Sequence, residues 1–397
     1  MPNTPVADGL TASPHEPGAR PPGKSGSDAR RSRWWILVTV SLAQVMVVLD
    51  ATIVNIALPT AQEDIGFSTE DRQWVVTAYA LAFGSLLLVG GRLGDMFGRK
   101  PVFAVGLIGF AAASAVGGAA STFEVLVAAR AGQGVFGALL APAALSILST
   151  TFVEHVERSR AFAIFGAISG AGGAIGLVLG GALTEYLSWR WCFYVNVGLA
   201  AVALIGAAIL LPRTLSQRSA AKLDVPGALL SVTGLVAVVY GLANAEADGW
   251  SSASTWGFIA VGVVILGLFA AVEARAAEPL LPLGVLLDRN RGGAFLAVGI
   301  VGAGTFGVFL FLTYYMATIQ AYDPLATGLA FLPMVGGVLV SAQLVPAVLA
   351  RVGAKLPVTA GFAVATLGML YLTQLEVDSS YTSGVLPGLV VVGLGIG

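Results

Sequence analysis

Residues 34–58 read WWILVTVSLAQVMVVLDATIVNIAL, an apolar stretch of 25 residues that contains a single charged side chain, Asp50. A helix needs roughly 20 residues, at 1.5 Å each, to cross about 30 Å of hydrocarbon. The stretch is too long for the core of a signal peptide, and no small-residue cleavage site follows it. We therefore expect a retained transmembrane helix.

The composition of the whole chain extends this prediction. Of 397 residues, 56% are apolar and 11% are charged, whereas about a quarter of an ordinary soluble domain is charged. The net charge of -1 leaves no basic surface for nucleic acid. The one cysteine, Cys192, excludes an intramolecular disulfide and a cysteine-rich metal site. These features exclude a soluble globular domain and predict an all-α integral membrane protein with no cofactor, metal or nucleic-acid partner.

Residues 1–33 differ from the rest because proline, glycine, serine and scattered charge replace the apolar runs. We predict a disordered cytoplasmic tail. Within it, residues 18–25 match the spelling of a Walker A phosphate-binding loop. That loop functions only between a strand and a helix, and here two prolines occupy it and no strand precedes it. We therefore expect no nucleotide binding.

Eleven apolar runs are long enough to span a membrane, and a twelfth, 384–397, has 14 residues. The eleven are 34–58, 73–91, 101–119, 124–149, 162–185, 191–211, 225–243, 256–275, 293–316, 327–350 and 356–374. With the N-terminus inside, 18 of the 21 Lys and Arg fall in cytoplasmic segments, Arg72 and Arg190 fall outside, and Arg130 lies within a span. The positive-inside rule therefore predicts a multi-pass protein of the cytoplasmic membrane with a cytoplasmic N-terminus.

An internal repeat organises these spans. FGRKPV at 97–102 is similar to VGAKLPV at 352–358, which suggests that the spans around the second turn copy those around the first. We predict an N-terminal six-helix bundle over 34–211, a linker with two inserted transmembrane helices over 212–291, and an incomplete C-terminal bundle over 292–397. A second bundle would need six spans, so we expect a truncated C-terminal part. A complete twelve-span protein with an unusual last helix is the alternative.

Two charges within the predicted spans are candidate functional residues. Asp50 and Arg130 lie at depths of about 12 and 9 Å from the same membrane face, so the two side chains can meet. An ionised group in a membrane is costly and usually faces a cavity or a partner. Because arginine stabilises an ionised carboxylate, separating the pair would let the carboxylate bind a proton. The alternative is a static ion pair that locks the bundle.

Two glycine-rich segments are further candidates. The turn GRLGDMFGRK at 91–100 joins two spans, and its glycines allow close helix approach. Residues 166–181, GAISGAGGAIGLVLGG, place bare backbone along one helix face, which permits helices to slide or rock. For the turn, spacing alone favours a short positive cytoplasmic loop without a special role. For residues 166–181, plain helix packing rests on the same physics, and the residues alone do not separate the two interpretations.

Aromatic, sulfur and amide side chains near the expected cavity suit an amphipathic substrate. Interfacial belts and lipid-facing packing are the competing explanation for most such residues. The candidates for the cavity are Met46, Trp74, Tyr79, Gln133 and Tyr314.

Several of these segments resemble the major facilitator superfamily, in particular its fourteen-helix drug:proton antiporters of the EmrB/QacA type. LDATIVNIALP at 49–59, QWVVTAY at 73–79, and SWRW at 188–191 with Asn196 are similar to motifs of the first, second and sixth spans in that branch. The turn at 91–100 and the arginine of RAGQG at 130–134 resemble two further superfamily motifs. Leu177 departs from the fifth-span motif, where proline is usual, which puts a kink there in doubt.

The resemblance implies alternating access between two six-helix halves, with substrate bound midway and exported. It implies that Asp50 and Arg130 take part in proton exchange. A conformational latch on the cytoplasmic side would comprise Gly91, Asp95, Gly98, Arg99 and Lys100. The antiporter motif of the fifth span would comprise Gly172, Gly176, Gly180 and Gly181.

We therefore expect proton-coupled efflux of amphipathic drugs or antibiotics by a monomer whose partners are the substrate, protons and lipid. An exporter or importer of an endogenous metabolite on the same fold is one alternative, and a non-transporting membrane sensor is another. An integral membrane enzyme is disfavoured, because neither His15 nor His155 lies in a span and no nucleophile, base or metal set converges.

Overall fold

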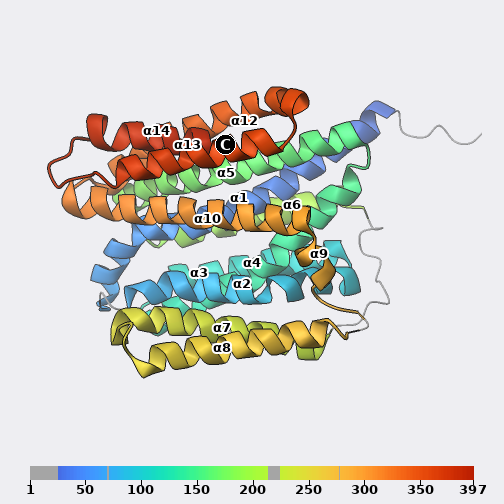
Figure 1. The fold of residues 1–397 in the computed structure, drawn as a ribbon, viewed down its shortest axis with the longest axis horizontal. Helices are drawn as coiled ribbons and strands as arrows, with labels where there is room; N and C mark the ends of the chain where they lie inside the picture. Colours follow the sequence, from blue (N-terminus) through green and yellow to red (C-terminus); the bar gives the residue numbers. More distant parts are fainter. Residues whose placement is uncertain (1–25, 69–70, 213–223, 277) are drawn as a thin grey trace, which may run out of the picture.

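The computed structural model describes residues 26–68, 71–212, 224–276 and 278–397 as a bundle of helices that run roughly along one axis (Figure 1). The Walker A look-alike and most of the predicted tail lie outside the described residues. The helices are α1 (Gly26–Ile65), α2 (Arg72–Phe97), α3 (Arg99–Gly118), α4 (Phe123–Thr151), α5 (His155–Tyr186), α6 (Trp191–Leu210), α7 (Val225–Asp248), α8 (Ala253–Glu273), α9 (Leu283–Leu287), α10 (Arg289–Tyr314), α11 (Pro324–Ala330), α12 (Leu332–Val352), α13 (Lys355–Leu372) and α14 (Leu386–Ile396).

The predicted spans coincide with these helices, with one interruption. Ten helices of the described chain are long and apolar enough to cross a membrane. The expected span 327–350 consists of α11 and α12, which meet at the buried Phe331. Pro333 stands in the first turn of α12, where a missing backbone N–H is tolerated, and it therefore starts a new helix. Helix α5 continues through Leu177 without a break.

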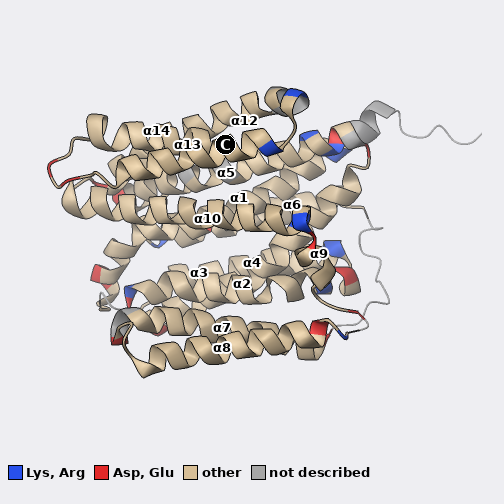
Figure 2. Cartoon of the chain, in the orientation of Figure 1, with Lys and Arg blue, Asp and Glu red and all other residues tan. Residues whose placement is uncertain are grey.

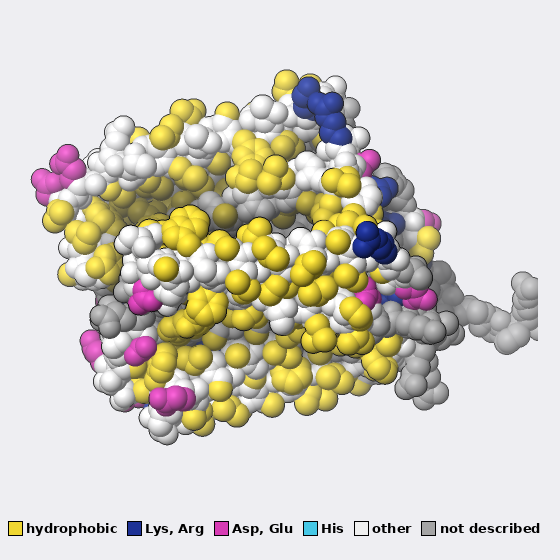
Figure 3. Space-filling model, turned by 60° about the horizontal axis from the view of Figure 1, so that its bottom comes forward, with side chains coloured by type: hydrophobic (Ala, Val, Ile, Leu, Met, Phe, Trp, Pro, Cys, Tyr) yellow, Lys and Arg dark blue, Asp and Glu magenta, His cyan; other side chains and the backbone are white. Residues whose placement is uncertain are grey.

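Charge and exposure follow the pattern expected of a protein surrounded by lipid. Lys, Arg, Asp and Glu gather at the two ends of the helices, and most Lys and Arg lie at the end where α1 begins (Figure 2). Between the ends, the surface in Figure 3 is mainly hydrophobic. On α8, for example, Val261, Val264 and Leu268 are more than half exposed. Apolar faces of this extent are incompatible with a water-facing surface and fit a hydrocarbon environment.

The helices form two groups with a hairpin beside them. Helices α1 to α6 make the first bundle. The inserted pair, α7 and α8, lies along one side of this bundle, and α10 to α14 lie together on the opposite side (Figure 1). The inserted pair packs on α2, where the rings of Trp74 and Tyr240 lie 5.7 Å apart. Gly98 and Gly353, at equivalent positions of the sequence repeat, both adopt positive φ, 91° and 74°. The repeat therefore extends to backbone conformation, because both turns use a geometry that favours glycine.

The two bundles share a buried apolar cluster. Ile56 of α1 and Leu177 of α5 share a core cluster with Phe309, Phe331 and Met334 of the second group. Within the described residues, no hydrogen bond or ion pair joins residues 26–211 to residues 289–397. The contacts between the two bundles in the described residues are therefore side-chain packing and close backbone approach.

Candidate functional site

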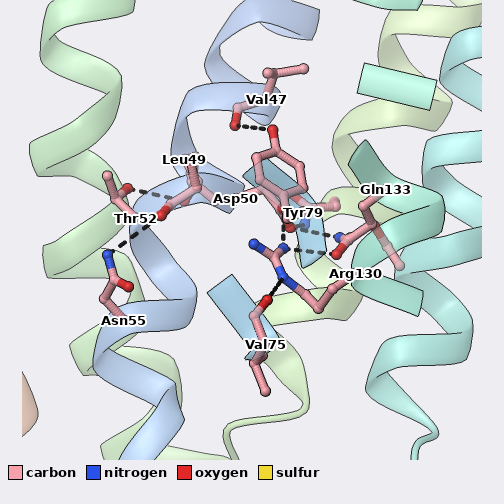
Figure 4. A network of polar contacts seen from close by, with 12 residues as sticks. Val47, Leu49, Asp50, Thr52, Asn55, Val75, Tyr79, Arg130 and Gln133 are labelled. Carbon is pink, nitrogen blue, oxygen red and sulfur yellow. Dashed lines mark hydrogen bonds and ion pairs between the residues drawn. The ribbon is translucent and has the colours of Figure 1, made fainter. Parts of the chain in front are cut away.

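A buried ion pair joins α1 to α4 near the middle of the first bundle. The Arg130 guanidinium donates from Nη1 to Asp50 Oδ2 at 2.5 Å, and the two side chains are 1% and 0% exposed. The structure thus brings together the two charges that the sequence placed at matching depth (Figure 4). Removing either partner would leave an uncompensated buried charge, which costs several kcal/mol.

Uncharged polar side chains complete the coordination of Asp50. Gln133 Nε2 donates to Asp50 Oδ1 at 2.7 Å, and Asn196 Nδ2 donates to the same oxygen at 2.6 Å. Gln133 also donates to Ser114 Oγ and accepts from Arg130 Nη1, both at 2.8 Å. Donors from α4 and α6 therefore reach the carboxylate on α1, and α3 joins them through Gln133. We name Asp50, Arg130, Gln133, Asn196 and Ser114 the carboxylate network.

Helix α2 holds the guanidinium from its other side. Arg130 Nε donates to the carbonyl oxygen of Val75 at 3.0 Å, and the guanidinium lies 4.4 Å from the centroid of the Tyr79 ring. The Tyr79 hydroxyl donates to the carbonyl oxygen of Val47 at 3.3 Å, which fixes the ring between α1 and α4. A desolvated cation–π contact of this kind is worth about 2 kcal/mol. Arginine, unlike lysine, can make all these contacts at once.

Gly134 allows α2 and α4 to approach closely enough for this arrangement. A Cβ added at Gly134 would lie 2.5 Å from the carbonyl oxygen of Tyr79. Any side chain there would push α2 away and lift the Tyr79 ring from Arg130. The close packing of α2 on α4 therefore requires glycine at this position.

The glycines of α5 pack α1 against it on both sides of Asp50. A Cβ added at Gly172 would contact Val48 at 3.4 Å, one at Gly176 would overlap Thr52 Oγ1 at 2.2 Å, and one at Gly180 would lie 2.7 Å from Ile53 Cγ1. Backbone-to-backbone packing of this kind requires small residues at the interface.

Gly181 turns towards the second bundle instead. A Cβ added there would lie 2.4 Å from the carbonyl oxygen of Pro324, at the start of α11. Gly328 on α11 reciprocates, because its added Cβ would lie 2.6 Å from the carbonyl oxygen of Leu177. One helix therefore contacts the helix that bears Asp50 and the opposite bundle through adjacent glycines.

The residues expected to form a latch are in contact with their own bundle. Lys100 Nζ donates to the carbonyl oxygens of Ala208 and Leu211 at 3.2 and 2.7 Å, so it caps the end of α6. Gly98 forms the turn with its positive φ, and a Cβ added at Gly91 would lie 3.6 Å from Pro142 Cβ of α4, which is ordinary contact.

Asp95 and Arg99 form no ion pair with each other in the described part of the chain, and Asp95 is exposed. Arg92, their neighbour in the turn, pairs instead with Glu278 at 2.5 Å. The turn is therefore tied to the segment that follows the inserted helices.

The expected cavity residues divide into three groups. Met46, Tyr79 and Gln133 are almost fully buried within the first bundle, so their side chains do not line an open cavity in this conformation. Trp74 packs on Tyr240 of the inserted pair. Tyr314, at the end of α10, is 56% exposed. Asn196 and Ser114 were not among the expected site residues, although a buried amide in an apolar span is a signal in itself.

The described residues contain no group of three His, Cys, Asp or Glu side chains arranged to hold a metal ion. Asp50 is the one carboxylate of the network.

Comparisons of this chain with known families, sequences and solved structures agree with one another. The sequence model of the Major Facilitator Superfamily matches residues 40–397. The puromycin resistance protein of Streptomyces alboniger is 51% identical over 94% of this chain and 74% of its own length. The cephamycin export protein of Amycolatopsis lactamdurans is 39% identical over 91% of this chain and 75% of its own length. The crystal structure of a peptide transporter, POT, in complex with sulfate aligns with a TM-score of 0.65 at 16% identity and covers 92% of this chain and 79% of its own. That structural likeness concerns the fold alone.

Proposed function

Because the chain belongs to the Major Facilitator Superfamily, we propose that it exports amphipathic antibiotics across the cytoplasmic membrane in exchange for protons. It acts as a carrier and not as an enzyme, works as a monomer, and has its N-terminus in the cytoplasm. Relatives named for resistance to puromycin and for export of cephamycin support the export direction and the class of substrate.

The observation that best supports proton coupling is the buried ion pair of Asp50 and Arg130. Protonation would remove the negative charge of Asp50 and with it the Coulomb attraction that joins α1 to α4. Release of the proton would restore this attraction. A change of charge in a low-dielectric site is worth several kcal/mol, enough to shift a balance between two conformations.

The apolar interface between the bundles supports alternating access. Helix α5 contacts α1 through Gly176 and α11 through Gly181. A small displacement of α1, caused by a change at Asp50, can therefore pass through α5 to the opposite bundle. The contact of α5 with α11 lies near the end of α5 that we place at the outer membrane face.

The charge distribution of the second bundle supports an amphipathic rather than a strongly ionic substrate. Between residues 292 and 350 the only ionisable Asp, Glu, Lys or Arg is Asp323, in the turn before α11. Substrate groups that face this bundle would meet aromatic and aliphatic side chains such as Phe309 and Tyr314. Puromycin, which combines an aromatic amino acid with a nucleoside, has the required character and is the first substrate to test.

The test is transport in vesicles. We expect wild-type protein in everted membrane vesicles to accumulate radiolabelled puromycin when the lumen is acidified, and to lose the accumulation when a protonophore collapses the gradient. Asp50→Asn, which keeps the size of the side chain, should insert normally and accumulate at least tenfold less. Equal accumulation by Asp50→Asn would contradict proton coupling through Asp50. Accumulation that persists without a gradient would contradict antiport altogether.

A further inference from the structure

The amide of Asn196 has one bonded end and one unbonded end. Asn196 lies on α6, is 0% exposed, and donates from Nδ2 to Asp50 Oδ1 at 2.6 Å. Its carbonyl oxygen, Oδ1, is buried and receives no hydrogen bond. Burying an acceptor without a donor is destabilising, because the atom loses its hydrogen bonds to water. Such an atom beside the only carboxylate of the network requires an explanation.

The neighbouring amide of Gln133 is held at both ends. Its Oε1 accepts from Arg130, and its Nε2 donates to Asp50 and to Ser114. Turning this amide over would break three hydrogen bonds and point its NH₂ at the guanidinium. Turning the amide of Asn196 would break only its bond to Asp50, because nothing donates to its Oδ1. Of the two amides, Asn196 is the one free to rotate.

A proton on Asp50 would demand such a rotation. Asp50 Oδ1 now accepts from two N–H donors, Gln133 and Asn196. An added proton converts this oxygen into a donor that faces two donors. The other ionisable groups that face Asp50 are Arg130, Tyr79 and Cys192, and Arg130 is held by Val75 and Gln133 as well.

We propose that Asn196 is a positioning residue that turns with the charge of Asp50. When Asp50 is ionised, Asn196 donates to it. When a proton from water adds to Asp50 Oδ1 and forms an O–H bond, the amide rotates about Cβ–Cγ and Oδ1 of Asn196 accepts from that O–H. On release the proton returns to water and the amide turns back. Asp50 thereby keeps its hydrogen bond to Asn196 in both charge states. This inference rests on the proposed role of Asp50 in proton exchange.

The direct test is infrared difference spectroscopy of the full-length protein between high and low pH, with ¹³C-labelled asparagine. The band of Asn196 is the labelled amide band that Asn196→Leu lacks. We expect this band to shift when the protonated carboxyl band of Asp50 appears, and we expect neither change in Asp50→Leu. A carboxyl band without any shift of the Asn196 amide would overturn the inference and leave proton coupling intact. Absence of the carboxyl band at every pH would overturn proton coupling itself.

A pair of nearly isosteric variants provides the functional test. The threonine hydroxyl of Asn196→Thr can donate to a carboxylate and accept from a carboxylic acid, whereas Asn196→Val can do neither. We expect Asn196→Thr to keep gradient-driven transport within about twofold and Asn196→Val to lose about tenfold, the value of one or two hydrogen bonds. Equal transport by the two variants would refute the switching role. Should Asn196→Val fail to insert, the spectra of the wild-type protein still decide.

Discussion

Gly176→Ala tests whether close packing of α5 on α1 positions Asp50. The added methyl carbon would lie 2.2 Å from Thr52 Oγ1 and 3.0 Å from the Leu49 carbonyl oxygen. Because Leu49 precedes Asp50, α1 must move at the network to relieve this overlap. Overpacking of a tight interface costs about 1–3 kcal/mol.

Gly166→Ala on the same helix is the matched control, because a Cβ there would meet nothing within 4 Å. The gain in helix propensity, about 1 kcal/mol, is common to both variants and cancels in the comparison. Gly176→Ala should therefore be less stable than Gly166→Ala by about 1–3 kcal/mol. Combining Gly176→Ala with Thr52→Ala removes the closest atom and should recover most of this loss.

The single cysteine provides the assay. Cys192 is 0% exposed, so a thiol-reactive fluorophore labels it only as the protein unfolds. Melting curves in detergent should place Gly176→Ala well below Gly166→Ala and the double variant between them. Equal melting temperatures for Gly176→Ala and Gly166→Ala would refute the claim that this contact positions α1.

Three further predictions concern other contacts. Gly181→Val should block the approach of α5 to α11 and reduce transport at least tenfold while the protein still inserts. Gly198→Val is the control, because an added Cβ there meets nothing within 4 Å, and it should transport normally. Equal transport by the two variants would contradict a role for the α5–α11 contact. Lys100→Met should lower stability by about 1 kcal/mol in melting curves, because the carbonyls that end α6 lose their cation; an unchanged melting temperature would show that water replaces it. Glu273→Gln should raise the melting temperature. Glu273 Oε1 and Asp224 Oδ2 both lack a hydrogen bond, and both lie within 2.7 Å of the point that a Cβ added to Gly227 would occupy, so the introduced amide nitrogen could donate to Asp224 Oδ2. A lower melting temperature would show that the carboxylate is needed.

The parts of the site that the sequence predicted are those in which a residue type is rare. Asp50 and Arg130 are conspicuous because charges within spans are costly, and helix rise alone placed them at matching depth. The glycines of α5 were also visible, because their spacing puts them on one face. The sequence could not show that this face meets two partners, α1 and α11, since that depends on how the two bundles dock.

The expected cavity residues show the limit of such reasoning. Met46, Tyr79 and Gln133 are buried in the first bundle, and Trp74 packs on the inserted pair. In a span that is apolar on all sides, the sequence does not show which face meets lipid, which meets a neighbour and which meets a cavity. The sequence does not predict the contact of Asn196 with Asp50 for a related reason, because that contact depends on the rotation of α6 relative to α1.

The measurement that tests the central claim most directly is substrate-induced proton release. Purified wild-type protein in a weakly buffered detergent solution, containing a pH indicator, should release protons when puromycin is added. Asp50→Asn should release none, although puromycin still binds as judged by equilibrium dialysis. The same proton release from Asp50→Asn as from the wild type would contradict Asp50 as the group whose proton is exchanged for substrate.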